Sequence, residues 1–229
     1  MISVFKTGKK IYELFVTEFV CNKFGLAEFF AENFIEEKKF FCALDAGCGV
    51  GPISIYLAEE FQAKVTAVDI NSQAIECCRK NINKYNLQKN IFAIEGNYAE
   101  VYKNFLKKFH LIVSNPPINT DVDKKILNKN FPSDFEKYQF LTNSWCDGQG
   151  LDLTDYILIS GKKLLTYDGR IFFVCCDIDC DPENYIEKKS EMYGYETELI
   201  CREKISATKL GISSKNFVTS YIFVCKLKF

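Results

Sequence analysis

The amino-acid sequence predicts a doubly wound, Rossmann-like α/β fold, in which a mostly parallel seven-stranded sheet ends in an antiparallel hairpin. Three observations predict this fold class. From residue 40 to residue 193, short apolar runs alternate with amphipathic stretches of helical periodicity, which is typical of parallel strands joined by crossover helices. Glycine-rich and proline-rich turns directly follow two of the apolar runs. The chain ends in two strand-like runs with no helical pattern between them, which indicates a hairpin at one edge.

The order of the elements follows from the same patterns. An N-terminal helical segment is expected over residues 1–39, because apolar residues between 10 and 36 recur at helical spacing and Gly25 is a natural break. Residues 40–229 are expected to form the α/β domain. Its strands are predicted at residues 40–44, 64–68, 91–94, 109–113, 171–176, 195–201 and 218–226, and its helices at 53–60, 72–85, 98–107, 152–165 and 182–192.

The composition is that of an ordinary globular domain. The 229 residues are 48% hydrophobic and 26% charged, with a formal net charge of −1, and this balance alone does not favour a strongly basic nucleic-acid binder. No run of 18 apolar residues and no signal-peptide pattern occurs, so we expect a cytoplasmic protein that does not span a membrane. The eleven cysteines include no C-x-x-C pair and His110 is the sole histidine, so we expect free thiols and no metal site.

A glycine-rich turn follows the first predicted strand, in the sequence Asp45-Ala-Gly47-Cys48-Gly49-Val-Gly51. Glycine adopts positive φ and lets the backbone approach a ligand closely, and such a turn lies at the ligand-binding end of a parallel sheet. A dinucleotide fingerprint requires a third glycine where Pro52 stands. The observed spacing has an acid ahead of the glycines. It suits a ligand with a positively charged group better than a ligand with a pyrophosphate.

Asp69 ends the second predicted strand. A carboxylate at this place can accept both hydroxyl hydrogens of a ribose. Nicotinamide cofactors use an acid in the same way, and an aspartate here can also simply cap the next helix. Asp69 therefore strengthens the prediction of a nucleoside ligand without deciding which one.

The sequence Asn115-Pro116-Pro117-Ile118 follows another apolar strand. Two prolines cannot continue a strand ladder, so the chain stops in a stiff turn on the same rim of the sheet as the glycines. An asparagine oxygen and a proline carbonyl can together accept two hydrogens from an NH2 group. This arrangement favours chemistry on a planar amine.

From residue 40 to residue 176, the combination of these motifs resembles class I S-adenosylmethionine-dependent methyltransferases of the small-domain type. That group includes ribosomal guanine-N2 and tRNA adenine-N6 methyltransferases and the glutamine methyltransferase of release factors. The resemblance implies that S-adenosyl-L-methionine binds with its methionine end near Asp45–Gly51, Cys48 included, and its ribose on Asp69. It implies adenine contacts from Ile70, Asn97 and Tyr98, and it makes Asn115, Pro116, Pro117 and Ile118 the amino-methylating turn.

The resemblance leaves the methyl acceptor open. We expect an exocyclic amino nitrogen of a base in ribosomal or transfer RNA; the alternatives are a glutamine in a protein such as a release factor and, less favoured, NAD-dependent oxidation. Two departures from the family matter. Ile118 stands where an aromatic residue is common and bears on the choice of acceptor, whereas Asn97 stands where Asp is common and bears on the adenine contact. The lysines at 103, 107, 108, 124, 125 and 129 are expected to flank the Asn-Pro-Pro turn and, with Lys204, Lys209 and Lys215, to contact phosphates.

Overall fold

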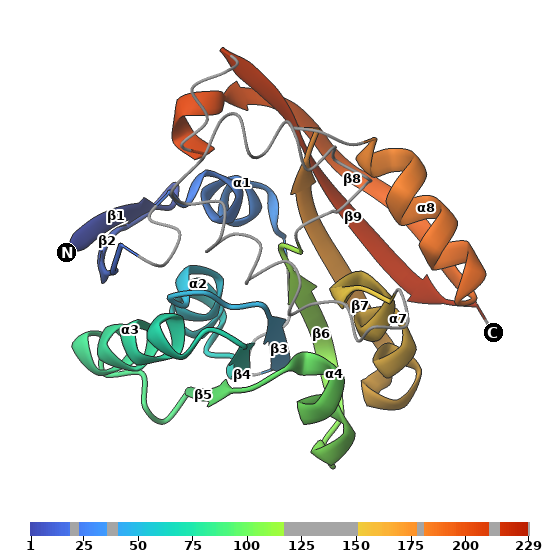
Figure 1. Cartoon of the computed structure of the whole chain (residues 1–229), viewed down its shortest axis with the longest axis horizontal. Coiled ribbons are helices and arrows are strands. Elements are labelled where there is room, and N and C mark those ends of the chain that lie inside the picture. The colour runs from blue at the N-terminus through green and yellow to red at the C-terminus, as the bar shows by residue number, and fades with distance from the viewer. Residues whose placement is uncertain (19–22, 36–40, 117–150, 178–180, 211–215, 229) are drawn as a thin grey trace.

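The computed structural model describes residues 1–18, 23–35, 41–116, 151–177, 181–210 and 216–228 (Figure 1). A small hairpin is formed by β1 (Ile2–Lys6) and β2 (Ile11–Phe15). The strands of the large sheet are β3 (Cys42–Ala46), β4 (Lys64–Asp69), β5 (Ile91–Glu95), β6 (Phe109–Ser114), β7 (Leu165–Cys176), β8 (Tyr195–Ser206) and β9 (Phe217–Leu227). The helices are α1 (Gly25–Asn33), α2 (Pro52–Phe61), α3 (Ser72–Lys84), α4 (Tyr98–Val101), α7 (Leu153–Leu164) and α8 (Pro182–Met192), with 3-10 turns η1 (Tyr102–Asn104) and η2 (Ala207–Leu210).

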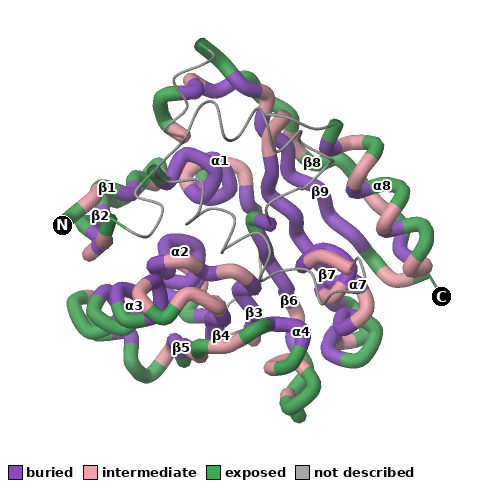
Figure 2. Tube along the Cα trace, in the orientation of Figure 1, coloured by how far each residue is buried: buried purple, intermediate pink, exposed green. Residues whose placement is uncertain are grey.

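The large sheet confirms the predicted fold class. Its seven strands lie in the order β5-β4-β3-β6-β7-β9-β8. The first five of these pair in parallel, and β9 pairs antiparallel with both β7 and β8. One hydrophobic cluster packs α1, α2 and α3 on one face, and a second packs α4, α7 and α8 on the other (Figures 1 and 2).

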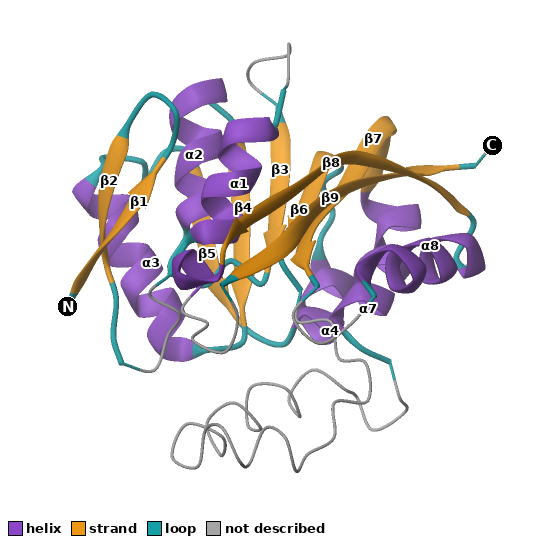
Figure 3. Cartoon of the chain, turned by 90° about the horizontal axis from the view of Figure 1, so that it is seen from above, coloured by secondary structure: helices purple, strands orange, loops and turns teal. Residues whose placement is uncertain are grey.

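Strand β3 lies where the chain order of the sheet reverses. The chain runs outward from β3 through β4 to β5 and then returns to β6 on the other side of β3. Open parallel sheets bind their ligands at such a switch point, outside the carboxyl ends of the strands. Figure 3 shows these parallel strands pointing toward one rim of the molecule. The turns that follow β3 and β6 therefore meet at this rim.

The predicted N-terminal helical segment is wrong over its first half. Residues 2–15 form the β1–β2 hairpin, in which Phe5, Tyr12 and Leu14 are buried while Ile11 and Glu13 point to solvent. This alternation has the period of two that strands require. The apolar residues at 11, 14 and 15 also fit a helical spacing, which is why the sequence alone misassigns them. The second half does contain a helix, α1, although Gly25 begins it instead of breaking it.

The remaining differences concern the lengths of elements. The predicted helix at 98–107 is limited to α4 and η1, and β7 begins six residues earlier than expected. Strand β8 extends to Ser206 instead of residue 201, because its pairing with β9 continues past an irregularity between Leu199 and Cys201. A β-bulge of this kind interrupts the alternation that marks a strand in a sequence.

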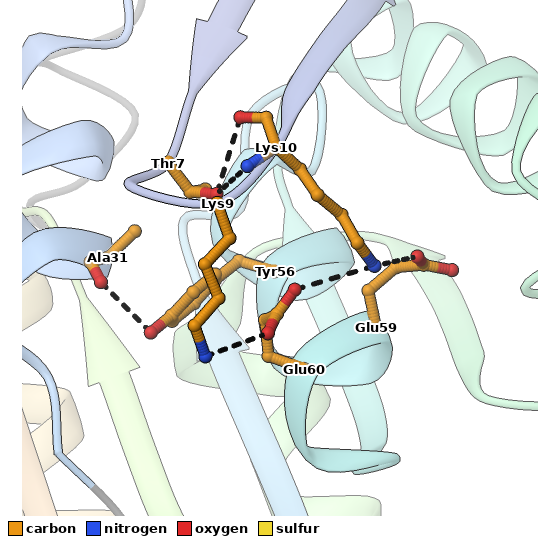
Figure 4. A network of polar contacts seen from close by, with 7 residues as sticks. All are labelled: Thr7, Lys9, Lys10, Ala31, Tyr56, Glu59 and Glu60. Carbon is orange, nitrogen blue, oxygen red and sulfur yellow. Dashed lines mark hydrogen bonds and ion pairs between the residues drawn. The ribbon is translucent and has the colours of Figure 1, made fainter.

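Ion pairs connect the hairpin turn to the end of α2 (Figure 4). The Nζ of Lys10 lies 2.9 Å from Glu59 and 3.4 Å from Glu60, and Lys9 lies 3.5 Å from Glu60. In the same region, the Tyr56 hydroxyl donates to the carbonyl of Ala31 at 2.9 Å. Exposed pairs of this kind contribute little stability, so buried contacts must hold the hairpin in place.

Asn81 supplies the main buried contact of the hairpin. Its side chain is fully buried, accepts from the N–H of Phe15 at 2.6 Å and donates to the carbonyls of Phe15 at 3.1 Å and of Val50 at 3.0 Å. One amide thereby joins β2 and α3 to the glycine-rich turn.

We therefore expect Asn81→Ala to lower the free energy of unfolding by about 2–4 kcal/mol, because buried backbone groups lose their partners. Urea unfolding measures this change. Asn83→Ala, on the exposed side of the same helix, is the matched control, with an expected change below about 0.5 kcal/mol. Equal effects of the two substitutions would contradict the assignment.

Candidate active site at the carboxyl ends of the strands

The glycine-rich turn is held by backbone hydrogen bonds to the neighbouring strand. The N–H groups of Gly47 and Cys48 both donate to the carbonyl of Val68, at 2.8 and 3.0 Å. Gly47, Gly49 and Gly51 have φ values of +82°, +55° and +89°, a region that other residues rarely adopt. At Gly51 a Cβ atom would also lie 2.7 Å from the Sγ of Cys78. The turn therefore needs glycine for its conformation and, at its end, for space.

Asp45 lies beneath this turn and is 2% exposed. Its carboxylate accepts from the Ser54 hydroxyl at 2.6 Å. Burial raises the pKa of Asp45 to about 7, while the bond from Ser54 opposes the shift. The carboxyl group is therefore readily protonated on its own, and a cation placed over the turn would favour its charged form.

Asp69 joins the turn to the end of β4. Its carboxylate accepts from the N–H of Gly49 at 2.7 Å and from the N–H of Asn71 at 2.9 Å. Burial raises the pKa of Asp69, and these backbone bonds act in the opposite direction. Asn71 in turn caps α3 by accepting from the N–H groups of Gln73 and Ala74.

A pocket opens beside Asp69. Its walls contain the residues expected to contact a nucleoside together with residues that the sequence did not single out: Gly47, Val68, Asp69, Ile70, Gly96, Asn97, Tyr98, Ala99, Leu153 and Tyr156. The Asn97 side-chain oxygen accepts from the N–H of Ala99 at 3.0 Å. The Tyr98 hydroxyl is hydrogen-bonded to that of Ser160 at 2.8 Å, and burial raises the pKa of Tyr98. The pocket thus combines an acid and an amide with apolar and aromatic walls.

Some contributors to this region leave no signal in the sequence. Leu153 and Tyr156 come from α7, which follows the pocket strands by more than fifty residues. Their three-residue spacing places both on one helix face, but nothing local shows which cavity that face meets. Ser54 was also missed, because a serine inside an apolar helix has no distinctive sequence signal.

Cys48 lines the turn without the features of a nucleophile. Its thiol is buried and lies 3.5 Å from the carbonyl of Gly49. Hydrogen bonding with Cys78 and burial both raise the pKa of Cys48. A thiol must ionise to attack, so Cys48 serves to pack the turn.

Asn115 follows β6 directly at the same rim. Val113 pairs with Asp45 across the sheet, and the Ser114 hydroxyl donates to the carbonyl of Ala46 at 2.6 Å. Asn115 is exposed and Pro116 is buried, so the asparagine faces outward. It follows the strand next to β3, which leads into the glycine-rich turn. Pro117 and Ile118 lie outside the described residues, as do the lysines at 124, 125, 129 and 215.

The expected position of Lys103, Lys107 and Lys108 is wrong. All three precede β6, whereas Asn115 follows it. Lys163 contacts both Lys103 and Lys108 and so joins them. Six strand residues separate these lysines from Asn115, and at about 3.3 Å per residue they lie on the order of 20 Å from it, at the opposite end of the sheet. Nearness in sequence to the Asn-Pro turn therefore does not place these lysines beside it.

Residues 26–133 match the protein family described as Methyltransferase small domain. The matched segment, just under half of the chain, is similar to a methyltransferase small domain. Ribosomal RNA small subunit methyltransferase C of Buchnera aphidicola subsp. Acyrthosiphon pisum is 39% identical over 134 residues, which cover 57% of this chain and 30% of that protein. The matching segment therefore spans less than a third of the length of this curated relative.

Solved methyltransferases share the fold of this domain. A methyltransferase from Pyrococcus furiosus superposes with a TM-score of 0.57 at 17% identity, covering 92% of this chain and 87% of that one. TYW2 of P. horikoshii, solved in complex with MeSAdo, superposes with a TM-score of 0.56 at 12% identity, covering 99% of this chain and 72% of that one. At these identities the likeness shows a shared Rossmann-like fold. Among the described residues, no helix is long and apolar enough to cross a membrane.

The raised pKa of Asp45 predicts a dependence of stability on pH. Because the folded carboxyl binds its proton up to about pH 7, whereas an unfolded one releases it near pH 4, the folded state binds more protons between these values. Stability should therefore fall as the pH rises from about 4 to 7.

We expect Asp45→Asn to remove a decrease on the order of 3 kcal/mol between pH 4.5 and pH 7.5, measured by urea unfolding. The matched control is Glu187→Gln, at an exposed position of α8, which should keep the decrease seen in the unsubstituted protein. If Asp45→Asn keeps it too, Asp45 does not have the raised pKa.

Proposed function

We propose that this domain transfers a methyl group from S-adenosyl-L-methionine to an exocyclic amino nitrogen of a base in ribosomal RNA. The observation that supports the proposal best is one juxtaposition. The pocket beside Asp69 and the outward-facing Asn115 lie at the ends of the two strands on either side of β3, and the glycine-rich turn lies between them. Cofactor and acceptor can therefore meet over that turn.

The pocket residues suit the nucleoside part of the cofactor. Asp69 has two carboxylate oxygens, each of which keeps acceptor capacity beyond its one backbone bond, and suits a ribose diol. Ile70, Tyr98 and Leu153 offer apolar surface to an adenine, and Asn97 offers its amide. The buried Asp45 suits a cationic amino acid group placed above Gly47 and Gly49.

When bound, S-adenosyl-L-methionine supplies a methyl group on a sulfonium, which an amine nitrogen attacks as the carbon–sulfur bond breaks. The task of the protein is to position the acceptor. The Asn115 side-chain oxygen and the Pro116 carbonyl would accept the two amine hydrogens, which turns the nitrogen lone pair toward the methyl group. One of these protons then leaves with water. Holding the reactants in line supplies most of the catalysis. We predict that Pro117 and Ile118 complete the amino-methylating turn.

The choice of RNA is supported by the relatives. Curated proteins similar to this chain are named ribosomal RNA small subunit methyltransferase C, although the match covers only part of their length. The same turn would suit a glutamine amide of a protein, so the acceptor needs a direct test. In the RNA assignment the protein acts in the cytoplasm, where ribosomes are made.

The proposal is tested by tritium transfer from labelled cofactor into fractionated RNA and protein from a host that lacks the gene. We expect label in ribosomal RNA, removed by ribonuclease treatment. Label that survives ribonuclease in a protein band would replace the base with a glutamine-type acceptor. Calorimetry with S-adenosylhomocysteine and with NADH separates the cofactor classes, and binding of NADH alone would exclude methyl transfer.

Asn115→Ala should separate catalysis from cofactor binding. We expect the dissociation constant of S-adenosylhomocysteine to change less than about twofold, while kcat of methyl transfer falls on the order of 100-fold or more, because the amine loses its orientation. Asp69→Asn provides the complementary control, since it should weaken cofactor binding instead. Normal turnover of Asn115→Ala at saturating cofactor would rule out its assigned role.

A further inference from the structure

Five exposed lysines gather at the end of the molecule opposite the pocket. This lysine patch consists of Lys103, Lys107, Lys108, Lys162 and Lys163. The Nζ of Lys163 donates to the carbonyl of Lys103 at 3.2 Å, and the Nζ of Lys108 donates to the carbonyl of Lys163. These bonds join the segment between α4 and β6 to the last turn of α7, so residues more than fifty positions apart form one surface (Figures 1 and 2).

Among the residues that the structure describes, ion pairs compensate little of the charge of the patch. Lys103 pairs with Glu100 at 3.0 Å. Elsewhere in the patch, the amines of Lys108 and Lys163 donate to backbone carbonyls, and the amine of Lys107 lies 5.1 Å from the centre of the Phe109 ring. Such contacts fix an ammonium group in place without neutralising it. Residues 98–110 and 160–170 together contain six Lys or Arg and two Asp or Glu, in a chain whose net charge is −1.

The C-terminal end of a helix attracts cations, which accounts for the lysines in the last turn of α7. It does not account for Lys107, which lies outside α7 and whose amine lies over the ring of Phe109, two residues further along the chain. Two large side chains beside the patch are also unusually exposed, Leu106 at 99% and Tyr167 at 83%. Tyr167 adjoins Thr166, whose hydroxyl donates to the carbonyl of Phe109 at 3.3 Å. Cations interleaved with exposed apolar and aromatic groups suit a nucleic acid, which offers phosphates together with sugar and base faces.

We propose that the lysine patch docks the sugar–phosphate backbone of a folded RNA substrate, about 20 Å from the amino-methylating turn. The inference rests on the proposed function, since it assigns a second contact to the same substrate. A short single-stranded segment around the target base would reach Asn115 alone. A folded RNA would reach both ends of the sheet, so the patch selects for structured RNA and adds affinity that is sensitive to salt.

The experiment compares Lys107→Gln/Lys162→Gln with the unsubstituted protein in filter binding to small-subunit ribosomal RNA transcribed in vitro. We expect about tenfold weaker binding at 0.1 M salt, and a plot of log affinity against log salt that is shallower by about 2, because two phosphates are no longer neutralised. KM for the RNA should rise while kcat at saturation and S-adenosylhomocysteine affinity stay unchanged. Lys107→Arg/Lys162→Arg should restore binding, because the charge is kept.

Lys188→Gln/Lys228→Gln removes two exposed lysines elsewhere and should leave the affinity and the salt slope unchanged. Equal binding by the patch variant and the unsubstituted protein would overturn the inference, as would an equal loss of affinity in this control. Normal binding of naked RNA with impaired methylation of ribosomal particles would also overturn it and point to an acidic protein surface. RNA binding that depends on the patch, without any methyl transfer by the unsubstituted protein, would support the inference and refute the proposed function.

Discussion

The bond from the Gly49 N–H to the Asp69 carboxylate fixes the geometry on which the rest of the site depends. It joins the turn after β3 to the end of β4 at 2.7 Å, and the same carboxylate fixes Asn71 at the start of α3. Gly49 has a positive φ, so its N–H is presented in a direction that other residues adopt only with strain. One buried acid therefore sets the shape of the turn, one wall of the pocket and the start of the next helix.

This arrangement carries an electrostatic cost. Asp45 and Asp69 are both acids whose pKa is raised chiefly by burial, and the charge of Asp69 adds to the shift at Asp45. Desolvated carboxyl groups weaken a fold unless they are hydrogen-bonded or neutralised. Ser54 and the backbone N–H groups compensate in part, and a cationic ligand over the turn would compensate further. Under the proposed function, the same burial that destabilises the charged acids would favour a ligand with positive charge.

The sequence predicted the parts of this site that local rules control. The glycine-rich turn and the Asn-Pro-Pro turn each need particular residues at particular places, so each leaves a local signal. The hairpin at residues 2–15 leaves an ambiguous signal, because the spacing of its apolar residues fits both a strand and a helix. Leu153 and Tyr156 line the pocket only because of how α7 packs. Lys107 lies far from Asn115 only because the whole of β6 separates them. Both facts depend on long-range topology.

Helix α7 connects the two ends of the molecule. Tyr156, near its start, lines the pocket, and Lys162 and Lys163 in its last turn belong to the lysine patch. Twelve helical residues span about 18 Å and behave as a rigid rod. At its start, Lys189 of α8 pairs with Asp152 at 2.9 Å and also with Asp155, and Tyr185 donates to Asp152. Burial opposes these bonds, but they prevail and lower the pKa of Asp152, so Asp152 keeps its charge at neutral pH. Since the helix is fixed at one end by this network and at the other by the bond from Lys108, the pocket and the patch are held at a constant separation.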